Sequence, residues 1–428
     1  MGEGWAKGIQ GDSNTTLLIP RCGESVHHAL GSWQWYHRRA RFLNSRTFPQ
    51  ASTLRWVLPL TAERREKHMT FKRTFAITLF FLSCTAAALL IAAETPPTAL
   101  LVLSKGALAL FIVDPATLAV VGQVPSGPDP HEVIASADGK LAYISNYGGG
   151  SYNTITVVDL VNQKALPVID LGPLRGPHGL TFVGGKLWFT AEGAKVIGSY
   201  DPATKTIDWV LGTGQDRTHM IYVFPDLKRI VASNVSSATM TVIDKGTRPG
   251  GPPPQTGGPG MPNAPGGPNA GGPGGPSQTI WSETVIPVGR GSEGFDVSPD
   301  GKEIWVANSQ DGTISIIDLA SKKVVQTLDA DVHSANRLKF TPDGKLVFVS
   351  MLGGPDLAVF DATTRKGVKR VKIGHGAAGI LMQPDGLRAF VACTPDDYVA
   401  VIDVKTLEMT GKITAAKHPD GLAWAVQK

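Results

Sequence analysis

Six histidines recur at matching places in the body of this sequence. They are His131, His178, His219, His333, His375 and His418. Each lies just before a short β-rich run that opens a repeat, and the seventh such position holds Glu293. A neutral imidazole is a good ligand for Cu, Zn, Fe or Ni, and it can act as a general acid or base near pH 7. The seven positions therefore offer six imidazoles and one carboxylate for a metal site or a catalytic site.

The histidines follow a repeat of about 42 residues. A β-rich run that ends in Asp occurs seven times, at Asp114, Asp159, Asp201, Asp244, Asp318, Asp361 and Asp403. Each repeat carries three more strand signals, and four repeats contain an Asp-Gly pair, as at Asp300-Gly301. Asp-Gly favours a tight hairpin in which both central residues take positive φ. Four short antiparallel strands at this period predict one blade of a β-propeller.

The two ends of the body supply complementary parts of one blade. Residues 420–426 match a first strand with nothing after it, whereas the chain from Ala99 matches strands two to four. The sequence therefore predicts an all-β fold over residues 98–428, a seven-bladed β-propeller closed by a C-terminal strand that joins the N-terminal blade. Closure leaves no exposed inner edge.

The first strand of a blade is the innermost, so its entry loop lies at the rim of the central channel. The six histidines and Glu293 are therefore expected to converge on one funnel, where copper or another transition metal is the candidate cofactor. A second interpretation stays open. Duplication copies a structural histidine along with its blade, and each imidazole then caps a backbone carbonyl or packs beside its neighbour.

Other polar residues are expected on the same face. Arg217 and Arg337, with Arg175 and Arg290, lie close to the histidines in sequence and could bind an anionic ligand, although single loop arginines are commonly solvated. The loops between second and third strands offer Asn146, Tyr147, Glu192, Asn234, Asn308, Cys393 and Asp396. Asn146 and Asn308 are candidate ligand-binding residues, but strand-end turn chemistry also explains them. Cys393 is either a small buried filler or a soft metal ligand.

The segments SPDGKEIWVANSQDGTISIIDLASKKVVQTL (298–328) and TPDGKLVFVS (341–350) resemble the YVTN family of β-propeller repeats. The resemblance covers about residues 98–428. It implies the fold, and propellers of this kind serve as binding proteins, cell-surface proteins and enzyme domains. The histidine ring is distantly similar to that of the propeller domain of nitrous-oxide reductase, which implies copper held by histidines of these loops. This sequence departs from that family because it contains no cupredoxin domain and one blade offers Glu293.

The N-terminal region differs from the body in charge and hydropathy. Residues 1–93 carry a net charge of +7 (12 Lys/Arg, 5 Asp/Glu) and residues 94–428 carry −2 (29 Lys/Arg, 31 Asp/Glu). The body therefore shows no footprint for nucleic acid. Residues 69–93 predict a signal peptide or signal anchor, and residues 1–68 are an extension that a misassigned start at Met1 would explain. Both readings of the leader predict a periplasmic or secreted body that meets a membrane only through an uncleaved leader.

Within the body, residues 246–277 are so rich in Gly and Pro that they predict a disordered insert between the third and fourth strands of one blade. Cys393 is the only cysteine of the body, so no disulfide is expected there.

Three functional hypotheses remain open. The first is an exported binding protein whose His-lined funnel takes a small molecule or a metal ion. The second is a lactonase-like hydrolase, or a metal-dependent redox enzyme, with Glu293 or a histidine as base. The third is a cell-surface scaffold that binds a protein partner on the propeller face.

Overall fold

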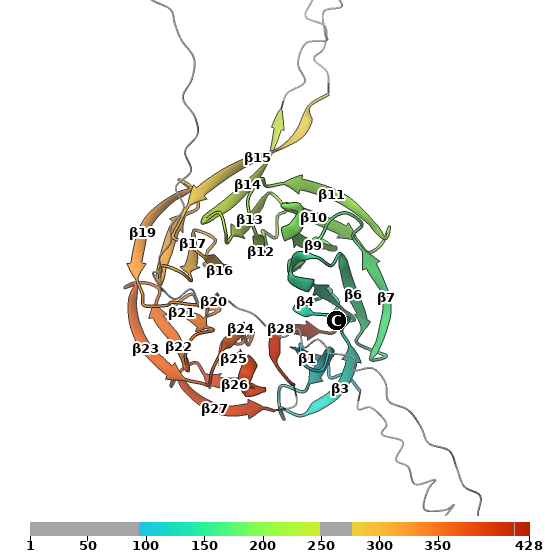
Figure 1. Ribbon diagram of the computed structural model, residues 1–428, viewed down its shortest axis with the longest axis vertical. Helices are drawn as coiled ribbons and strands as arrows, with labels where there is room; N and C mark the ends of the chain where they lie inside the picture. Colours follow the sequence, from blue (N-terminus) through green and yellow to red (C-terminus); the bar gives the residue numbers. More distant parts are fainter. Residues whose placement is uncertain (1–93, 249–275, 415) are drawn as a thin grey trace, which may run out of the picture. The chain divides into compact units, whose positions relative to one another are not determined.

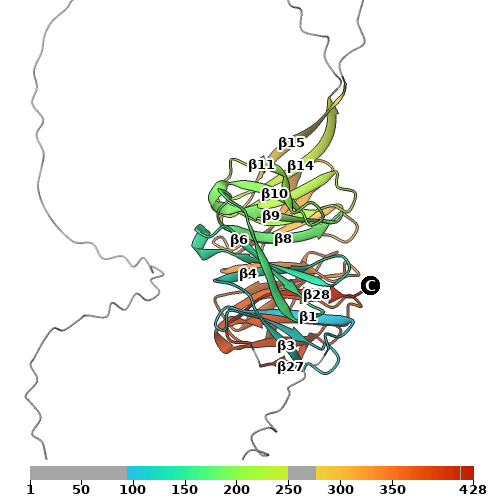
Figure 2. The same ribbon diagram turned by 90° about the vertical axis from the view of Figure 1, so that its right-hand side faces the viewer.

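The computed structural model describes residues 94–248, 276–414 and 416–428 (Figure 1). These residues form seven four-stranded antiparallel sheets, arranged as blades around an axis. Figure 2 shows the same ring from the side. The all-β, seven-bladed prediction is therefore confirmed. The predicted extension and leader lie outside the described residues, and within the described ranges no helix is long and apolar enough to span a membrane.

The blades are numbered along the chain, and each is given from the axis outward. Blade 1 is β28 (Pro419–Val426), β1 (Thr98–Ser104), β2 (Ala109–Val113) and β3 (Val120–Pro125); blade 2 is β4 (Pro130–Ala135), β5 (Leu141–Asn146), β6 (Thr154–Asp159) and β7 (Lys164–Asp170). Blade 3 is β8 (Pro177–Val183), β9 (Lys186–Ala191), β10 (Val196–Asp201) and β11 (Thr206–Gly212); blade 4 is β12 (Thr218–Val223), β13 (Arg229–Asn234), β14 (Thr239–Arg248) and β15 (Gln278–Pro287). Blade 5 is β16 (Ser292–Val297), β17 (Glu303–Asn308), β18 (Thr313–Asp318) and β19 (Lys323–Asp329); blade 6 is β20 (Ala335–Phe340), β21 (Leu346–Met351), β22 (Asp356–Asp361) and β23 (Lys366–Lys372); blade 7 is β24 (Ala377–Met382), β25 (Arg388–Cys393), β26 (Tyr398–Asp403) and β27 (Glu408–Ile413).

The C-terminal strand closes the ring as predicted. β28 pairs antiparallel with β1, with Thr98 opposite Val426 and Leu101 opposite Ala423. Inner strands of neighbouring blades also contact one another around the full ring, including β28 with β4 and with β24. Blade 1 is therefore built from both ends of the body, and this pairing closes the ring.

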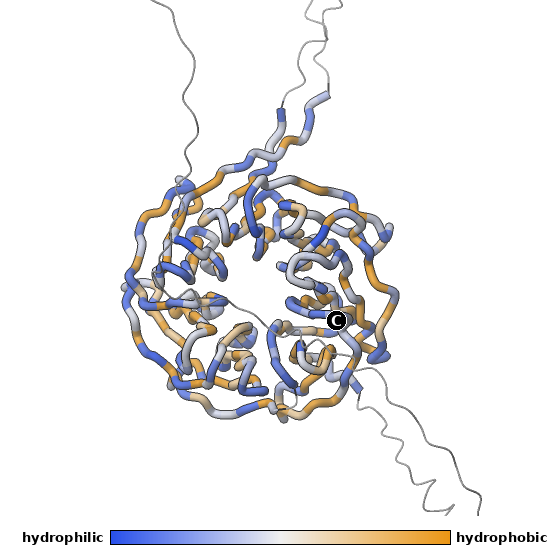
Figure 3. The backbone as a smooth tube through the Cα atoms, in the orientation of Figure 1, coloured by the Kyte–Doolittle hydropathy of each residue, from blue (hydrophilic) through white to orange (hydrophobic). Residues whose placement is uncertain are grey.

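The hydrophobic core lies between neighbouring blades. The second and third strands are buried on both faces, because the next blade covers each side, and they read as nearly continuous apolar runs such as EIWVAN in β17. The fourth strands lie at the outside and are mostly exposed, as β23 shows. In Figure 3 hydrophobic stretches lie within the blades and hydrophilic segments lie at the turns. The apolar runs of the repeat therefore form the contacts that hold neighbouring blades together.

The Asp-Gly hairpins differ from the prediction. Gly139, Gly301, Gly344 and Gly386 have φ between +69° and +74°, but none of the preceding Asp residues has a positive φ. In blade 5 the N–H of Gly301 bonds the carbonyl of Ser298, and the Asp300 carboxylate accepts from Ser298 Oγ and Lys302 N. This is a type I turn followed by a left-handed glycine. The Asp carboxylate stabilises the turn by local hydrogen bonds, so only the glycine needs the left-handed conformation.

The Gly/Pro-rich insert follows the third strand of blade 4, as predicted, but the strands continue further than expected. β14 extends to Arg248 and β15 begins at Gln278, and these two residues still face each other in the ladder. Residues 246–248 therefore belong to β14. Their pairing with β15 continues past the point at which the third and fourth strands of the other blades stop pairing. Residues 249–275 lie outside the described part of the chain.

Candidate functional site

A repeated irregularity places the second residue of each inner strand at the axis. In blades 2 to 7 the pairing of the inner strand skips two residues after its first pair, which is a bulge that re-aims side chains. In four blades a hydroxyl of the second strand accepts the hydrogen bond of the third residue's N–H; these are Ser145, Thr190, Ser233 and Ser350. From blade 1 to blade 7 the second residues are Asp420, His131, His178, His219, Glu293, Asn336 and Ala378.

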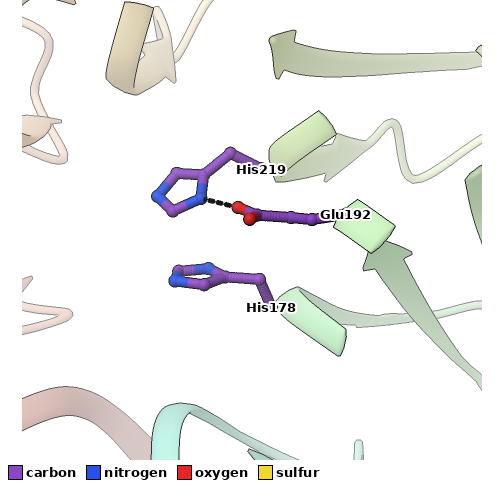
Figure 4. Close-up of side chains that lie close together, drawn as sticks. All are labelled: His178, Glu192 and His219. Atoms are coloured by element: carbon purple, nitrogen blue, oxygen red, sulfur yellow. Dashed lines mark hydrogen bonds and ion pairs between the residues drawn. The ribbon is translucent and has the colours of Figure 1, made fainter. Parts of the chain in front are cut away.

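Three of these residues are histidines of neighbouring blades, and their rings lie in contact. The ring centroids of His131 and His178 are 5.1 Å apart, and those of His178 and His219 are 3.8 Å apart. His178 and His219 are 3% and 2% exposed. Figure 4 shows these two rings, one over the other, beside Glu192. The structure therefore brings together three of the six predicted histidines.

Glu192 is positioned by a short 3₁₀ helix, η2 (Glu192–Ala194), between β9 and β10. Its buried carboxylate accepts a 2.5 Å hydrogen bond from the Tyr147 hydroxyl and pairs with Nδ1 of His219. Tyr147 lies next to η1 (Gly148–Gly150) and meets the rings of His131 and His178 edge-on. Burial raises the pKa of Tyr147, and the neighbouring Glu192 carboxylate raises it further. The phenol is therefore a hydrogen-bond donor that holds Glu192 ionised and in place.

Glu293 flanks His219 on its other side. Its Oε1 lies 2.9 Å from Nε2 of His219, although off the direction of a hydrogen bond, so this buried nitrogen has no hydrogen-bond partner. Arg217 completes the group, with Nε 3.6 Å from Glu192 and a terminal nitrogen 3.7 Å from Glu293. Two carboxylates therefore bracket one buried imidazole.

The two buried histidines have opposite protonation tendencies. Burial lowers the pKa of His178 well below its ordinary value, and the charges of His219 and His131 lower it further. Burial also lowers the pKa of His219, but the charges of Glu293 and Glu192 outweigh burial and raise it. His178 is thus neutral, with its buried Nδ1 lacking a hydrogen-bond partner, while His219 favours the imidazolium. The carboxylates of Glu192 and Glu293 therefore stabilise a positive charge at His219.

An ion pair crosses the axis next to this group. Arg337, the third residue of β20 in blade 6, pairs with Glu132, the third residue of β4 in blade 2. Arg337 is 6% exposed. Burial lowers its pKa, but Glu132, Asp420 and Glu293 outweigh burial and raise it. The predicted ligand-binding residue Arg337 is therefore already paired within the protein.

Blade 1 adds a second ion pair at the same level. Lys105 Nζ lies 2.8 Å from Asp420 and 3.2 Å from Nδ1 of His131. Asp129 lies 3.4 Å from Nε2 of His131 on the opposite side. Both nitrogens of His131 therefore face charged neighbours, which separates it chemically from the buried pair His178 and His219.

The other three predicted histidines do not join this group. His333, His375 and His418 are exposed and lie one or two residues before their inner strands. They therefore fall in the connecting loops, two or three positions earlier than the bulge that directs a side chain to the axis. His375 N–H bonds Asp396, and His418 N–H bonds Asp397. The expectation of one ring of six imidazoles was wrong for this reason.

The remaining candidates have structural contacts. The side-chain amide of Asn146 donates to Thr154 and Thr156, and that of Asn308 donates to Thr313 and Ser315. These bonds pin the start of the third strand, although Oδ1 of both residues is buried without a partner. Their role in ligand binding stays a prediction.

Cys393 is fully buried in the core between blades 6 and 7, and burial raises the pKa of its thiol to about 12. It acts as a small apolar filler there.

The arrangement offers three donors to one metal ion. One ligand atom each from His178, Glu192 and His219 lie within 4.8 Å of one another. Two ligands about 2.1 Å from one metal are at most about 4.2 Å apart, so a small inward movement would suffice. The sequence indicated Glu192 only as a loop residue, and it gave no sign of Glu132, Lys105 or Asp420. Aligning the second and third residues of the inner strands would have found Glu132 and Asp420.

Glu293 should make the fold sensitive to acid. Burial alone would raise its pKa, but the charges of His219, Arg217 and Arg337 lower it from 4.5 to about 2. A carboxylate with a depressed pKa stabilises the fold above its unfolded pKa, and this contribution is lost as the pH falls through the folded value. We expect the free energy of unfolding to fall by roughly 3 kcal/mol between pH 5 and pH 2 from this group. Urea denaturation at several pH values should show a shallower dependence for Glu293→Gln. An unchanged slope would contradict the assignment.

Comparisons with known proteins agree with the fold. A family model described as the cytochrome D1 heme domain matches residues 287–387, which is less than a quarter of the chain. No curated protein sequence matches.

Several solved structures are similar in shape. A functionally unknown protein from Desulfotomaculum acetoxidans is 12% identical with a TM-score of 0.59, covering 77% of this chain and 99% of that one. A putative 6-phosphogluconolactonase from Bacteroides fragilis is 18% identical with a TM-score of 0.56, covering 77% of this chain and 98% of that one. The dihydro-heme d1 dehydrogenase NirN in complex with DHE is 16% identical with a TM-score of 0.51, covering 76% of this chain and 65% of that one. The chain is a seven-bladed β-propeller, distantly similar to these propellers.

Proposed function

We propose that this protein is an exported propeller that binds one transition-metal ion at its axis, through His178, His219 and Glu192. The observation that carries the proposal is the buried, unpartnered Nδ1 of His178 beside an imidazole and a carboxylate, with all three ligand atoms within 4.8 Å. A buried polar nitrogen without a partner is costly. A metal ion that accepts its lone pair would remove that cost.

The electrostatics of the group support a cation. The two carboxylates Glu192 and Glu293 lie on either side of His219. His178 is held neutral by burial, which is the form that binds metal. The ion would take the place of the proton on His219. Two imidazoles and one carboxylate leave positions open for a substrate or water, as catalytic metal sites do.

A neighbouring side chain also holds the Glu192 carboxylate in position. The Tyr147 hydroxyl bonds the second oxygen of Glu192, which orients the carboxylate. Partners of this kind commonly fix ligand orientation and affect affinity about 10- to 100-fold. Export rests on the predicted leader at 69–93, and detection of the body in a periplasmic or culture fraction would test it.

Metal titration of residues 94–428, without a histidine tag, tests the site directly. We expect one equivalent of Co²⁺ or Zn²⁺ to bind by calorimetry, and His178→Ala to weaken binding at least about 100-fold, or about 2.7 kcal/mol. Loss of one of three ligands explains this change. The control is His375→Ala, which removes an imidazole that is 70% exposed and outside the group. Equal affinities for the two variants would overturn the proposal.

A tetrapyrrole is the second candidate ligand, favoured by the family match over residues 287–387. That segment contains His333 and His375, which are exposed on the loops before β20 and β24, and either imidazole could bind the iron of such a group. Titration with hemin decides: a Soret shift that is lost in His333→Ala or His375→Ala, but kept in His178→Ala, would favour the tetrapyrrole over the axial metal ion.

A further inference from the structure

The residue before each inner strand has a left-handed backbone. These seven residues are Asp129, Gly176, Arg217, Gly291, Ser334, Gly376 and His418, with φ between +42° and +73°. Three blades use glycine, which adopts this conformation without strain. Every blade therefore requires a left-handed residue at this position. A residue other than glycine adopts this conformation only at a cost in backbone free energy.

Among these seven residues, Arg217 is the one whose side chain lies against the proposed metal site of His178, Glu192 and His219. Its side chain is 43% exposed, whereas the Glu192 carboxylate beneath it is 4% exposed. Its nitrogens lie 3.6 Å from Glu192 and 3.7 Å from Glu293, both longer than a hydrogen bond. The guanidinium is held to the two carboxylates by charge at these distances rather than by a short hydrogen bond. The positive charge of Arg217 therefore lies on the solvent side of Glu192 and Glu293.

We propose that Arg217 binds the ligand of the axial metal, and that this ligand is a small carboxylate. The inference rests on the proposed metal site. A divalent ion would share the charge of Glu192, which weakens the hold of that carboxylate on Arg217. The planar guanidinium then presents paired N–H donors, which match a carboxylate in two parallel hydrogen bonds. A carboxylate bound between the metal and Arg217 would balance the positive charge of both.

The proposal predicts two effects of opposite sign. Removing the positive charge of Arg217 takes away a cation that lies 3.6 Å from a metal-binding carboxylate, so Arg217→Gln should bind Co²⁺ as tightly as the unmodified protein or more tightly. The same change should weaken carboxylate binding about tenfold. Arg217→Gly should do the same while keeping or raising the melting temperature, because glycine suits the left-handed position.

Cobalt provides the readout, because anion binding changes its visible absorption. The Co²⁺-loaded protein is titrated with acetate, and with acetamide as the uncharged analogue of similar shape. The matched control is Arg290→Gln, an arginine that is 72% exposed and pairs with Asp311. We expect acetate to bind the unmodified and Arg290→Gln proteins alike, the Arg217 variants about tenfold more weakly, and acetamide to bind none of them measurably.

The two proposals fail in different ways. If the unmodified protein takes up no Co²⁺, the metal site is wrong and the carboxylate proposal fails with it. If Co²⁺ binds but acetate binds Arg217→Gln as tightly as Arg290→Gln, only the role of Arg217 is overturned. Equal binding of acetamide and acetate would also overturn it, because charge would then not be recognised.

Discussion

A chain that ends at Ala416, and so lacks β28, should not form a stable propeller. β28 supplies the inner strand of blade 1, and it buries Leu422, Ala423 and Ala425. The indole N–H of Trp424 also bonds the Met382 carbonyl of blade 7. Burial of Leu422 alone contributes about 1.5–3 kcal/mol, and the partly buried Trp424 adds to it. Because domains are stable by only about 5–15 kcal/mol, we expect loss of the cooperative thermal transition seen by circular dichroism.

The closing strand can be returned as a separate molecule. A synthetic peptide of residues 416–428, added to the truncated chain, should restore a cooperative transition whose midpoint rises with peptide concentration. The control truncation ends at Val426 and removes only Gln427 and Lys428, whose N–H groups bond the carbonyls of Pro97 and Asp138; it should unfold nearly as the full chain does. A truncated chain that unfolds like this control would show that β28 is dispensable.

Arg337→Met should lower the free energy of unfolding by about 3–5 kcal/mol. The substitution keeps most of the side-chain volume but leaves the largely buried carboxylate of Glu132 at the axis without its cation, since its side chain is only 14% exposed. Breaking a buried ion pair costs more than the pair contributes, because the remaining charge stays desolvated. The negative charges of Asp420 and Glu293 also act on Arg337. Once the cation is removed, these carboxylates would repel Glu132 and lower the stability further. Urea denaturation at pH 7 measures the change.

A double-mutant cycle separates this ion pair from side-chain packing. Glu132→Gln in the Arg337→Met background should recover much of the lost stability, because the uncompensated charge is removed. Arg290→Met is the matched surface control, and its exposed pair with Asp311 should contribute no more than about 1 kcal/mol. If Glu132→Gln gives no recovery, the charge of Glu132 is not what destabilises Arg337→Met.

The repeat was sufficient to predict the ring. Its period and its seven Asp-ended strands describe contacts within a blade or between successive blades, and those are local in sequence. The split first blade was visible because each end of the body carries only part of the repeat, although the pairing of the two ends is long-range. The Asp that ends a strand illustrates this: Asp318 bonds Ser321, three residues later, and such a bond can be anticipated from the residues alone. The blade count, the closure by residues near Trp424 and the place of the Gly/Pro-rich insert followed from the same local pattern.

The sequence by itself thus determined the seven-bladed fold, whereas only the tertiary structure decided which residues stand at the axis and which side chains meet there. His178 and His375 look alike in the repeat, yet a shift of three residues puts one at the bulge and the other on an exposed loop. The pairing of Glu132 with Arg337 joins residues 205 positions apart. The physical reason is that the residue pattern of a strand is enough to place it within its own blade. Contacts between side chains at the axis depend in addition on the bulge of each inner strand, on the length of the loop before it and on the closure of the whole ring.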